Sequence, residues 1–320
     1  MLYAYRLETG KLARLPAGSA LDDAIWVDLY KPQPEQVDLA RALGVDVPSL
    51  ADMEEIEISN RLYSEAGVDY LTVVLPGLSE TKLPISGPVC FILTPTRLLT
   101  VRHHVPRSFE TFPERAEKVG PGCDTPEKLF LGLTEEIIGR LADLLEGAGR
   151  ALDEVSRSVY AADAQARTAA LLQATLEKVG RESDLVSRIR LSLLTLERAV
   201  GFFGHLIASR KGAEGLRPVV KGALRDIAAL EVHGDYLATR VAQATDATLG
   251  MINLMQNVTV RIVSVVAVLF LPPTLIASVY GMNFRVMPEL DETWGYPMAV
   301  GLMIASAALS YLYFKWKKWL

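Results

Sequence analysis

Two long runs without charged residues lie near the C-terminus, and they constrain the fold more than any other feature of the sequence. The first, IVSVVAVLFLPPTLIASVY, covers residues 262–280, and the second, YPMAVGLMIASAALSYLYF, covers residues 296–314. A helix needs about 20 mainly apolar residues to cross a bilayer core of roughly 30 Å. Two helices buried in a soluble core would show the same hydropathy, but uncharged runs of this length favour two transmembrane helices.

Cationic side chains flank the outer ends of the two runs. Arg261 precedes the first run, and Lys315, Lys317 and Lys318 follow the second. Because Lys and Arg are enriched on the cytoplasmic side of membrane proteins, both outer ends are predicted to be cytoplasmic and the connector 281–295 external. The N-terminal residues show no charged leader followed by an apolar run, which predicts no signal peptide and a cytoplasmic N-terminus.

The rest of the chain divides into a β-rich part and a helical part. The first part alternates short strand-like runs such as AIWVDLY and GPVCFILT with turns and short helical segments, which predicts a mixed α/β domain. The next part shows helical periodicity and opens with Thr125 as an N-cap before Pro126, which predicts a helical hairpin followed by one long helix. The predicted divisions are an α/β domain 1–124, a hairpin 125–217, a stalk helix with the first span 218–280, a connector 281–295, a second span 296–314 and a basic tail 315–320.

The length of the predicted stalk helix implies assembly. An unbroken helix over 218–280 is roughly 90 Å long, about three times the thickness of the bilayer core. A single helix of that length would be solvated on all sides and unstable, so it needs partners. Two transmembrane helices are too few to enclose an aqueous path, and any conducting form must therefore be an oligomer around a shared axis.

One face of this helix carries a stripe at steps of three and four residues. It begins polar, becomes apolar within the first run and turns weakly polar near the end of that run. The stripe consists of Asp246, Gly250, Asn253, Asn257, Val260, Val263 or Ser264, Ala267, Leu271, Thr274 and Ser278. The spacing fits a closely packed helix interface as well as a pore lining. Asn257 favours a pore, because a polar side chain where the helix enters the membrane needs a partner, which water or a hydrated ion supplies.

The C-terminal segment resembles the CorA family of magnesium transporters. FLPPTLIASVYGMNFRVMPEL, followed by WGYP and YLYFKWKKWL, is similar to that family, and Gly281, Met282 and Asn283 match its GMN signature. The N-terminal MLYAYRLETGKLARL and AIWVDL are similar to the opening of proteobacterial members, so the resemblance spans most of the chain. It implies an α+β membrane protein of the inner membrane: a homopentameric funnel in which the stalk helix continues as the inner transmembrane helix.

The resemblance also implies roles for individual residues. Asn283 would lie at the external mouth, and the conduit would be lined by Asn257, Val260, Val263, Leu271 and Thr274. Several members have methionine at the positions of Val260 and Leu271, which leaves the width of the apolar constriction open. In the family, cytoplasmic acids between subunits bind Mg²⁺ and hold the pore closed, and the candidates here are Asp226 and the cluster containing Glu54 and Glu55.

The chemistry of Mg²⁺ fits a pore without carboxylates. Mg²⁺ gives up its water reluctantly, and a dry pore would need carboxylates to replace the hydration shell. Neither run contains Asp or Glu, so the ion is predicted to keep much of its water and to be held by neutral amides such as that of Asn283. The connector carries Glu289, Asp291 and Glu292 against Arg285, where close family members often have Glu. These acids form either an ordinary solvated loop or a rim that raises the local cation concentration.

Other functional classes fit less well. His103 and His104 are adjacent in a predicted strand and point to opposite faces, which favours a structural role over a shared metal ion. Cys90 and Cys123 lack the spacing of a zinc or redox motif. The net charge of −5 argues against nucleic acid, and the absence of a phosphate loop, nucleophile elbow or catalytic constellation argues against an enzyme of any kind. No organic cofactor is expected.

Three functions remain. The favoured one is a Mg²⁺ channel gated by intracellular Mg²⁺, with Co²⁺ and Ni²⁺ as further cargo because similar hydrated ions are hard to separate. The second is a Zn²⁺ transporter of the related ZntB type, with or without proton coupling; its members commonly vary the GMN triplet and lack the MPEL continuation. The third is a membrane-anchored helical scaffold without transport, which gives no reason for the asparagine in the connector.

Overall fold

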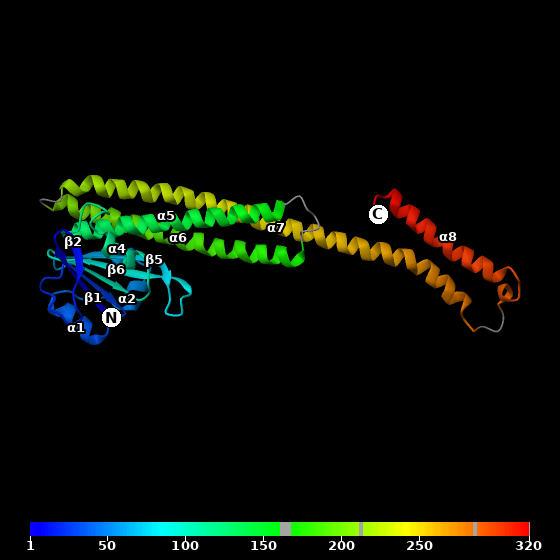
Figure 1. Cartoon of the computed structure of the whole chain (residues 1–320), viewed down its shortest axis with the longest axis horizontal. Coiled ribbons are helices and arrows are strands. Elements are labelled where there is room, and N and C mark those ends of the chain that lie inside the picture. Colours follow the sequence, from blue (N-terminus) through cyan, green and yellow to red (C-terminus); the bar gives the residue numbers. More distant parts are fainter. Residues whose placement is uncertain (161–167, 211–213, 284–286, 320) are drawn as a thin grey trace. The chain divides into compact units, whose positions relative to one another are not determined.

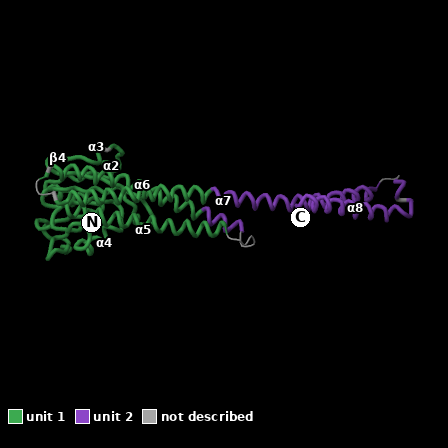
Figure 2. Tube along the Cα trace, turned by 90° about the horizontal axis from the view of Figure 1, so that it is seen from above, with its two compact units in different colours: residues 1–160, 177–245 green, residues 161–176, 246–320 purple. Residues whose placement is uncertain are grey.

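The computed structural model describes residues 1–160, 168–210, 214–283 and 287–319. The chain folds into two compact units (Figure 2). Unit 1 comprises Met1–Tyr160 and Glu177–Thr245, and unit 2 comprises Ala161–Leu176 and Asp246–Leu320.

Unit 1 contains a seven-stranded mixed sheet with the strand order β2-β1-β3-β7-β6-β5-β4. The strands are β1 (Leu2–Glu8), β2 (Lys11–Arg14), β3 (Trp26–Tyr30), β4 (Leu62–Glu65), β5 (Val68–Leu78), β6 (Pro84–Leu93) and β7 (Leu98–Arg102). Neighbouring strands are antiparallel except β3 and β7, which pair in parallel. All residues of β7 are buried, as expected for a central strand covered on both faces.

Helices cover both faces of this sheet, and the longest of them continues into unit 2. The α-helices are α1 (Pro34–Ala42), α2 (Leu50–Glu54), α3 (Ile58–Arg61), α4 (Ser108–Arg115), α5 (Pro126–Tyr160), α6 (Ala169–Ser209), α7 (Arg217–Tyr280) and α8 (Gly295–Trp316). Two short 3-10 helices are η2 (Glu214–Leu216) and η3 (Pro288–Leu290). Figure 1 shows α5, α6 and the first part of α7 running side by side within unit 1.

Alternation along the strands directs large side chains to the helices on each face. Phe91 of β6 makes an edge contact with Phe130 of α5, and Phe130 in turn packs on Phe203 of α6 at a centroid distance of 4.7 Å. Ile92, the next residue of β6, joins the core on the opposite face with Met53 of α2. The sheet is therefore the middle layer of three, and α5 and α6 are fixed to it by aromatic packing.

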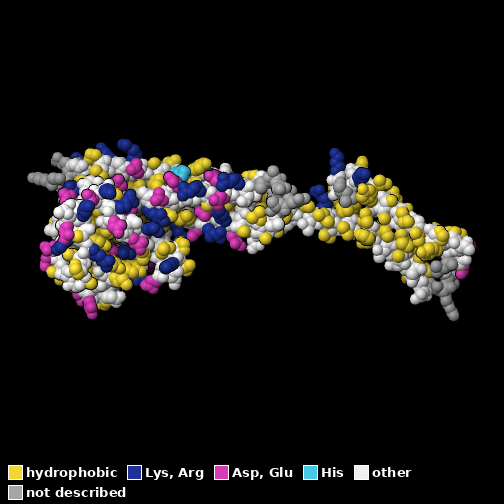
Figure 3. Space-filling view, viewed as in Figure 1, with side chains coloured by type: hydrophobic (Ala, Val, Ile, Leu, Met, Phe, Trp, Pro, Cys, Tyr) yellow, Lys and Arg dark blue, Asp and Glu magenta, His cyan; other side chains and the backbone are white. Residues whose placement is uncertain are grey.

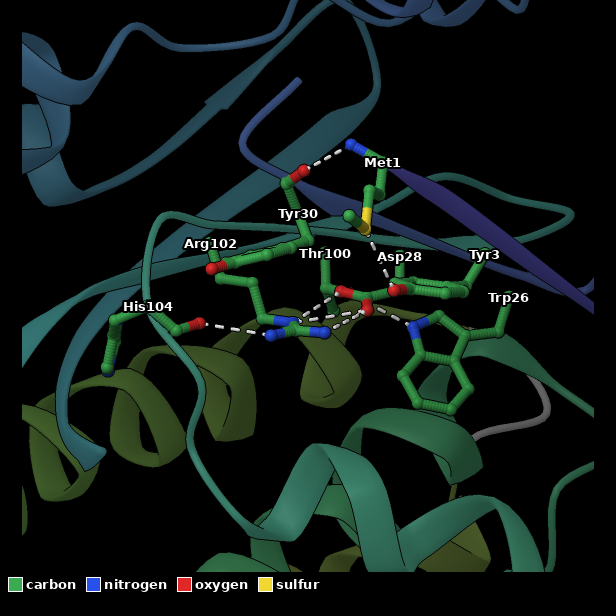
Figure 4. Close-up of polar contacts among 8 residues, drawn as sticks. All are labelled: Met1, Tyr3, Trp26, Asp28, Tyr30, Thr100, Arg102 and His104. Atoms are coloured by element: carbon green, nitrogen blue, oxygen red, sulfur yellow. Dashed lines mark hydrogen bonds and ion pairs between the residues drawn. The ribbon is translucent and has the colours of Figure 1, made fainter. Parts of the chain in front are cut away.

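A buried ion pair ties the parallel strands β3 and β7 together (Figure 4). Arg102 Nη2 donates to Asp28 Oδ2 at 2.9 Å, and Arg102 Nε donates to both carboxylate oxygens at 3.1 Å. Thr100 Oγ1 also donates to Asp28, and Trp26 Nε1 donates to Thr100 Oγ1. Because each partner satisfies the other's buried charge, removal of one alone should destabilise the fold by about 3–5 kcal/mol.

His104 is a packed core side chain, and His103 beside it is half-buried. The Nε2 atom of His104 lies 2.9 Å from the carbonyl oxygen of Leu75, and burial lowers the pKa of the imidazole to about 4. A Cβ atom at Gly77 or Gly87 would lie 2.6 or 2.8 Å from this ring. Both glycines therefore make room for a neutral histidine with a structural role.

Three helices of the described chain are long and apolar enough to cross a membrane: α6, α7 and α8. The sequence predicts spans only in the last two. In the most apolar stretch of each helix, the share of residues buried inside the structure is 44% for α6, 6% for α7 and 11% for α8. Packing on α5 and the sheet accounts for the apolar residues of α6, whereas most of the apolar surface of α7 and α8 is not covered by any described residue.

Candidate functional site

The membrane part of α7 has one covered face. Val265 is buried with 5% exposure, and Leu269 and Ile276 are half-buried in the same line along the helix. Arg261 lies on this side as well, with its guanidinium carbon 5.8 Å from the centroid of the Trp319 ring. Because Trp319 lies three residues after the end of α8 at Trp316, we assign this face to the contact between the two apolar helices of unit 2.

The predicted stripe lies on the opposite face of α7. At about 100° per residue, Ala267 and Thr274 point roughly 180–200° away from Val265. Exposures of 64% for Val260, 63% for Val263 and 64% for Leu271 show that the described residues leave this face largely uncovered. Ser278 is exposed there too.

The two residues that the spacing left as alternatives differ in their exposure. Val263 is largely exposed on the stripe face, whereas Ser264 is half-buried and lies about 100° around the helix from it. The Ser264 hydroxyl donates to the carbonyl of Val260 at 2.8 Å. Both residues stay candidates for the stripe, because Ser264 is the less exposed of the two but lies only about 20° around the helix from Leu271.

The N-terminal part of the stripe is polar and exposed. Asp246, Gly250, Asn253 and Asn257 all lie on the surface of α7 in the single chain. By helical geometry they fall within a broad arc on the same side as Leu271.

The GMN triplet directly follows the end of α7 at Tyr280. The backbone N–H of Gly281 donates to the carbonyl of Ala277 at 2.9 Å, and that of Met282 donates to Val279 at 3.3 Å. A Cβ atom at position 281 would lie 3.0 Å from the Ala277 oxygen, so glycine relieves crowding in this last turn. Asn283 follows it and is exposed.

The acids of the connector lie next to the start of α8. Asp291 and Glu292 are exposed, and Glu289 is half-buried in η3. A Cβ atom at Gly295 would lie 1.9 Å from the backbone oxygen of Glu289, so only glycine fits where α8 begins. Arg285, the cation predicted to oppose these acids, lies outside the described residues.

The candidate regulatory acids are not gathered into a metal site within one chain. Asp226, Glu54 and Glu55 are all exposed, and the described residues contain no group of three or more His, Cys, Asp or Glu side chains that could hold a metal ion. A site built from these acids would need ligands from another copy of the chain.

Sequence reasoning missed the contact between Arg261 and Trp319. The two residues are far apart in the sequence, and the KWKKWL segment indicates only a basic membrane boundary. Charge and aromatic residues at the outer ends of both spans are the signal that could have paired them.

Comparison with known proteins gives consistent results. A family model described as "CorA-like Mg2+ transporter protein" matches residues 22–317. The magnesium transport protein CorA of Haemophilus influenzae is 33% identical over 323 residues, covering 100% of both chains. The complete structure of the CorA magnesium transporter from Methanocaldococcus jannaschii has a TM-score of 0.72 at 17% identity, covering 100% of this chain and 99% of that one. The predicted fold class, an α/β domain followed by long helices with apolar C-terminal spans, is confirmed.

The fold is also found in a protein named for a different transporter. The ZntB cytoplasmic domain from Vibrio parahaemolyticus has a TM-score of 0.53 at 14% identity, covering 78% of this chain and 96% of that one. The fold of unit 1 therefore does not by itself distinguish between the transported ions.

Proposed function

Because the chain belongs to the CorA family of Mg²⁺ transporters, which are not enzymes, we propose that it carries Mg²⁺ through an axial pore shared by several copies. The observation that carries this proposal is the uncovered stripe on α7, opposite the face packed on α8 and leading to Asn283. Amide side chains such as those of Asn257 and Asn283, at the two ends of this face, are unfavourable against lipid, so this face meets other copies and water.

The proposed assembly is a homopentamer with a funnel shape in the inner membrane. Five copies of α7 would surround the axis, and α8 would form an outer ring next to lipid. Asp246 and Asn253 would form polar rings in the stalk. The cations flanking both spans support an orientation with both chain termini in the cytoplasm and the connector outside.

The side chains on the stripe suit a hydrated cation. Water molecules bound to Mg²⁺ point their hydrogens outward, so the pathway must offer hydrogen-bond acceptors. Thr274 Oγ1 donates to the carbonyl of Phe270 at 2.7 Å, which leaves its lone pairs as acceptors on the pore side. The amide oxygens of Asn257 and Asn283 would act in the same way at the two ends, and the connector acids would attract cations to the mouth.

The intact GMN triplet and the MPEL continuation favour Mg²⁺ over a ZntB-type function. A pathway that contacts only the water shell of a hydrated ion also accepts other hydrated ions of similar size and charge. Co²⁺ and Ni²⁺ are therefore further candidate cargo. A membrane-anchored scaffold without transport would not need hydrogen-bond acceptors along an uncovered helix face.

Two matched cysteine variants test the pore face. Thr274→Cys lies on the stripe and Ile276→Cys on the face towards α8, at nearly the same depth. A small charged thiol reagent should block Mg²⁺ flux through the Thr274→Cys protein and leave the Ile276→Cys protein active. The native cysteines, Cys90 and Cys123, are both buried and should not react. Equal block of both variants, or of neither, would contradict the proposed orientation of α7.

We further propose that intracellular Mg²⁺ closes the pore by bridging acids of neighbouring copies. Exposed carboxylates such as Asp226 and Asp246 would repel their counterparts around a symmetric axis. Bound Mg²⁺ offsets this repulsion only in the closed arrangement, and the switch requires tighter binding to the closed state. The cluster with Glu54 and Glu55 is the second candidate for this role.

Limited proteolysis tests this feedback. Millimolar Mg²⁺ should slow cleavage of the detergent-solubilised oligomer between residues 1 and 250, because it holds the stalks together. A monovalent salt of equal ionic strength is the control and should give little protection. Equal protection by both salts would mean general screening and would rule out a specific Mg²⁺ bridge.

A further inference from the structure

Four cations gather at the end of unit 2 where α8 ends. This basic cluster consists of Arg261, Lys315, Lys317 and Lys318. None of them forms a salt bridge within the described residues, whereas other Lys and Arg side chains do. Figure 3 shows dark blue side chains at this end of unit 2, beside a yellow apolar surface and without magenta on that face. No described acidic side chain therefore neutralises the charge of this basic cluster.

Aromatic contacts hold the basic cluster in a defined shape. The ring of Trp319 stacks on Phe314 with an interplanar angle of 24° and lies under the guanidinium of Arg261. Lys317 lies over the ring of Trp316, with its Nζ 5.6 Å from the centroid. These contacts bring a cation from α7 and cations from the end of α8 to the same level of the membrane.

The last turn of α8 is a Schellman motif. Trp319 N–H donates to the carbonyl of Phe314 and Lys318 N–H donates to that of Lys315, at 3.0 and 3.1 Å. The motif requires a left-handed residue, which is usually glycine, and here Lys318 occupies it with φ 55°. A lysine at this position carries a steric penalty that glycine would avoid. The chain therefore keeps a charge where its backbone favours glycine.

We propose that the basic cluster binds the phosphate groups of anionic phospholipids on the side of the membrane where α7 enters. Several Lys and Arg side chains immediately beside a transmembrane helix attract anionic headgroups. Trp316, Trp319 and Tyr313 are 76%, 46% and 52% exposed, as expected for aromatic side chains at the headgroup level. The apolar surfaces of α7 and α8 adjoin the cluster, so the site offers places for both a phosphate and an acyl chain.

A lipid fits this combination better than a small anion or an acidic peptide. A free phosphate would use the charges but not the adjoining apolar surface, and a peptide would have to compete with the lipid that surrounds both spans. The effect of one Lys or Arg near the membrane surface corresponds to about a fivefold change in binding. This inference rests on the membrane location of α7 and α8 and does not depend on the ion that is transported.

Substitutions at Lys318 test whether this lysine binds lipid or only caps the end of α8. The full chain, carrying Trp294→Phe to leave the tryptophans of the cluster as the membrane reporters, is placed in vesicles of phosphatidylcholine mixed with brominated phosphatidylglycerol. A second set of vesicles carries the bromine on phosphatidylcholine instead. The quenching of tryptophan fluorescence in the first set, divided by that in the second, reports the preference for the anionic lipid. Lys318→Gly should lower this preference about fivefold, and Lys318→Arg should retain it.

The same variants carry their own folding control. Because glycine suits the left-handed position, Lys318→Gly should match or exceed the parent protein in thermal stability in detergent. Arg261→Gln should lower the preference to a similar extent, and Lys221→Gln, a change of an exposed lysine in unit 1, should not. An unchanged preference in Lys318→Gly and Arg261→Gln would overturn the proposal. Displacement of the lipid by inorganic phosphate beyond that caused by chloride of equal ionic strength would also overturn it.

Discussion

Asn283→Ala is expected to reduce Mg²⁺ flux into vesicles to the level of protein-free vesicles. The amide is the exposed polar side chain that follows the last turn of α7, and no other residue of the GMN triplet has an acceptor in its side chain except the weak thioether of Met282. Without the amide oxygen, the GMN triplet offers only the weak thioether of Met282 to the water shell of the arriving ion.

Assembly must be measured together with flux for this variant. Size-exclusion chromatography in detergent should show an oligomer of unchanged size, because an exposed side chain beyond the end of α7 contributes little to packing. Near wild-type flux through an assembled Asn283→Ala protein would exclude the role given to this amide.

Leu271→Asp is expected to produce a leaky channel. Leu271 is 64% exposed in the single chain and lies on the stripe face within the first apolar run. A ring of leucines around an axis blocks ions by excluding water, and a ring of carboxylates would hydrate the constriction and attract cations. Resting Mg²⁺ current through the variant should rise well above that of the wild-type protein when internal Mg²⁺ is high.

Val266→Asp is the matched control for this leak. Val266 is 50% exposed in the single chain, similar to Leu271, but it lies about 140° around the helix from it. In the proposed oligomer it faces away from the axis, and a carboxylate there should impair insertion by roughly 2.5–3.5 kcal/mol per chain. If Leu271→Asp impairs insertion as Val266→Asp does, and no leak is seen, the stripe is a lipid or packing face.

Hydropathy predicts the course of α7 well but does not identify spans by itself. The expected helix over 218–280 and the observed Arg217–Tyr280 differ by one residue, because an apolar, nearly proline-free sequence has few places to end a helix. The same criterion also selects α6, and only its burial in the core of unit 1 distinguishes it from a span. Tertiary contacts are thus needed to separate a core helix from a transmembrane helix.

The stripe could be read from the sequence, whereas its surroundings could not. A period of 3.6 residues places Thr274 and Leu271 on one side whatever the fold, but the position of α8 on the opposite side follows from contacts between distant residues. The same is true of Arg261 and Trp319, and of the close approach between Gly295 and the Glu289 carbonyl. Sites formed between copies, such as the proposed Mg²⁺ bridge, depend on contacts that one chain does not contain.

Flux through purified protein in vesicles tests the central claim most directly. The protein is reconstituted alone, and uptake of Mg²⁺ and of Zn²⁺ is followed with ion-sensitive dyes, with and without a pH gradient. A hydrated-ion pore predicts Mg²⁺ uptake down its own gradient, stronger than Zn²⁺ uptake and unchanged by the pH gradient. Zn²⁺ uptake that requires a pH gradient, with no Mg²⁺ uptake by the same vesicles, would contradict the account.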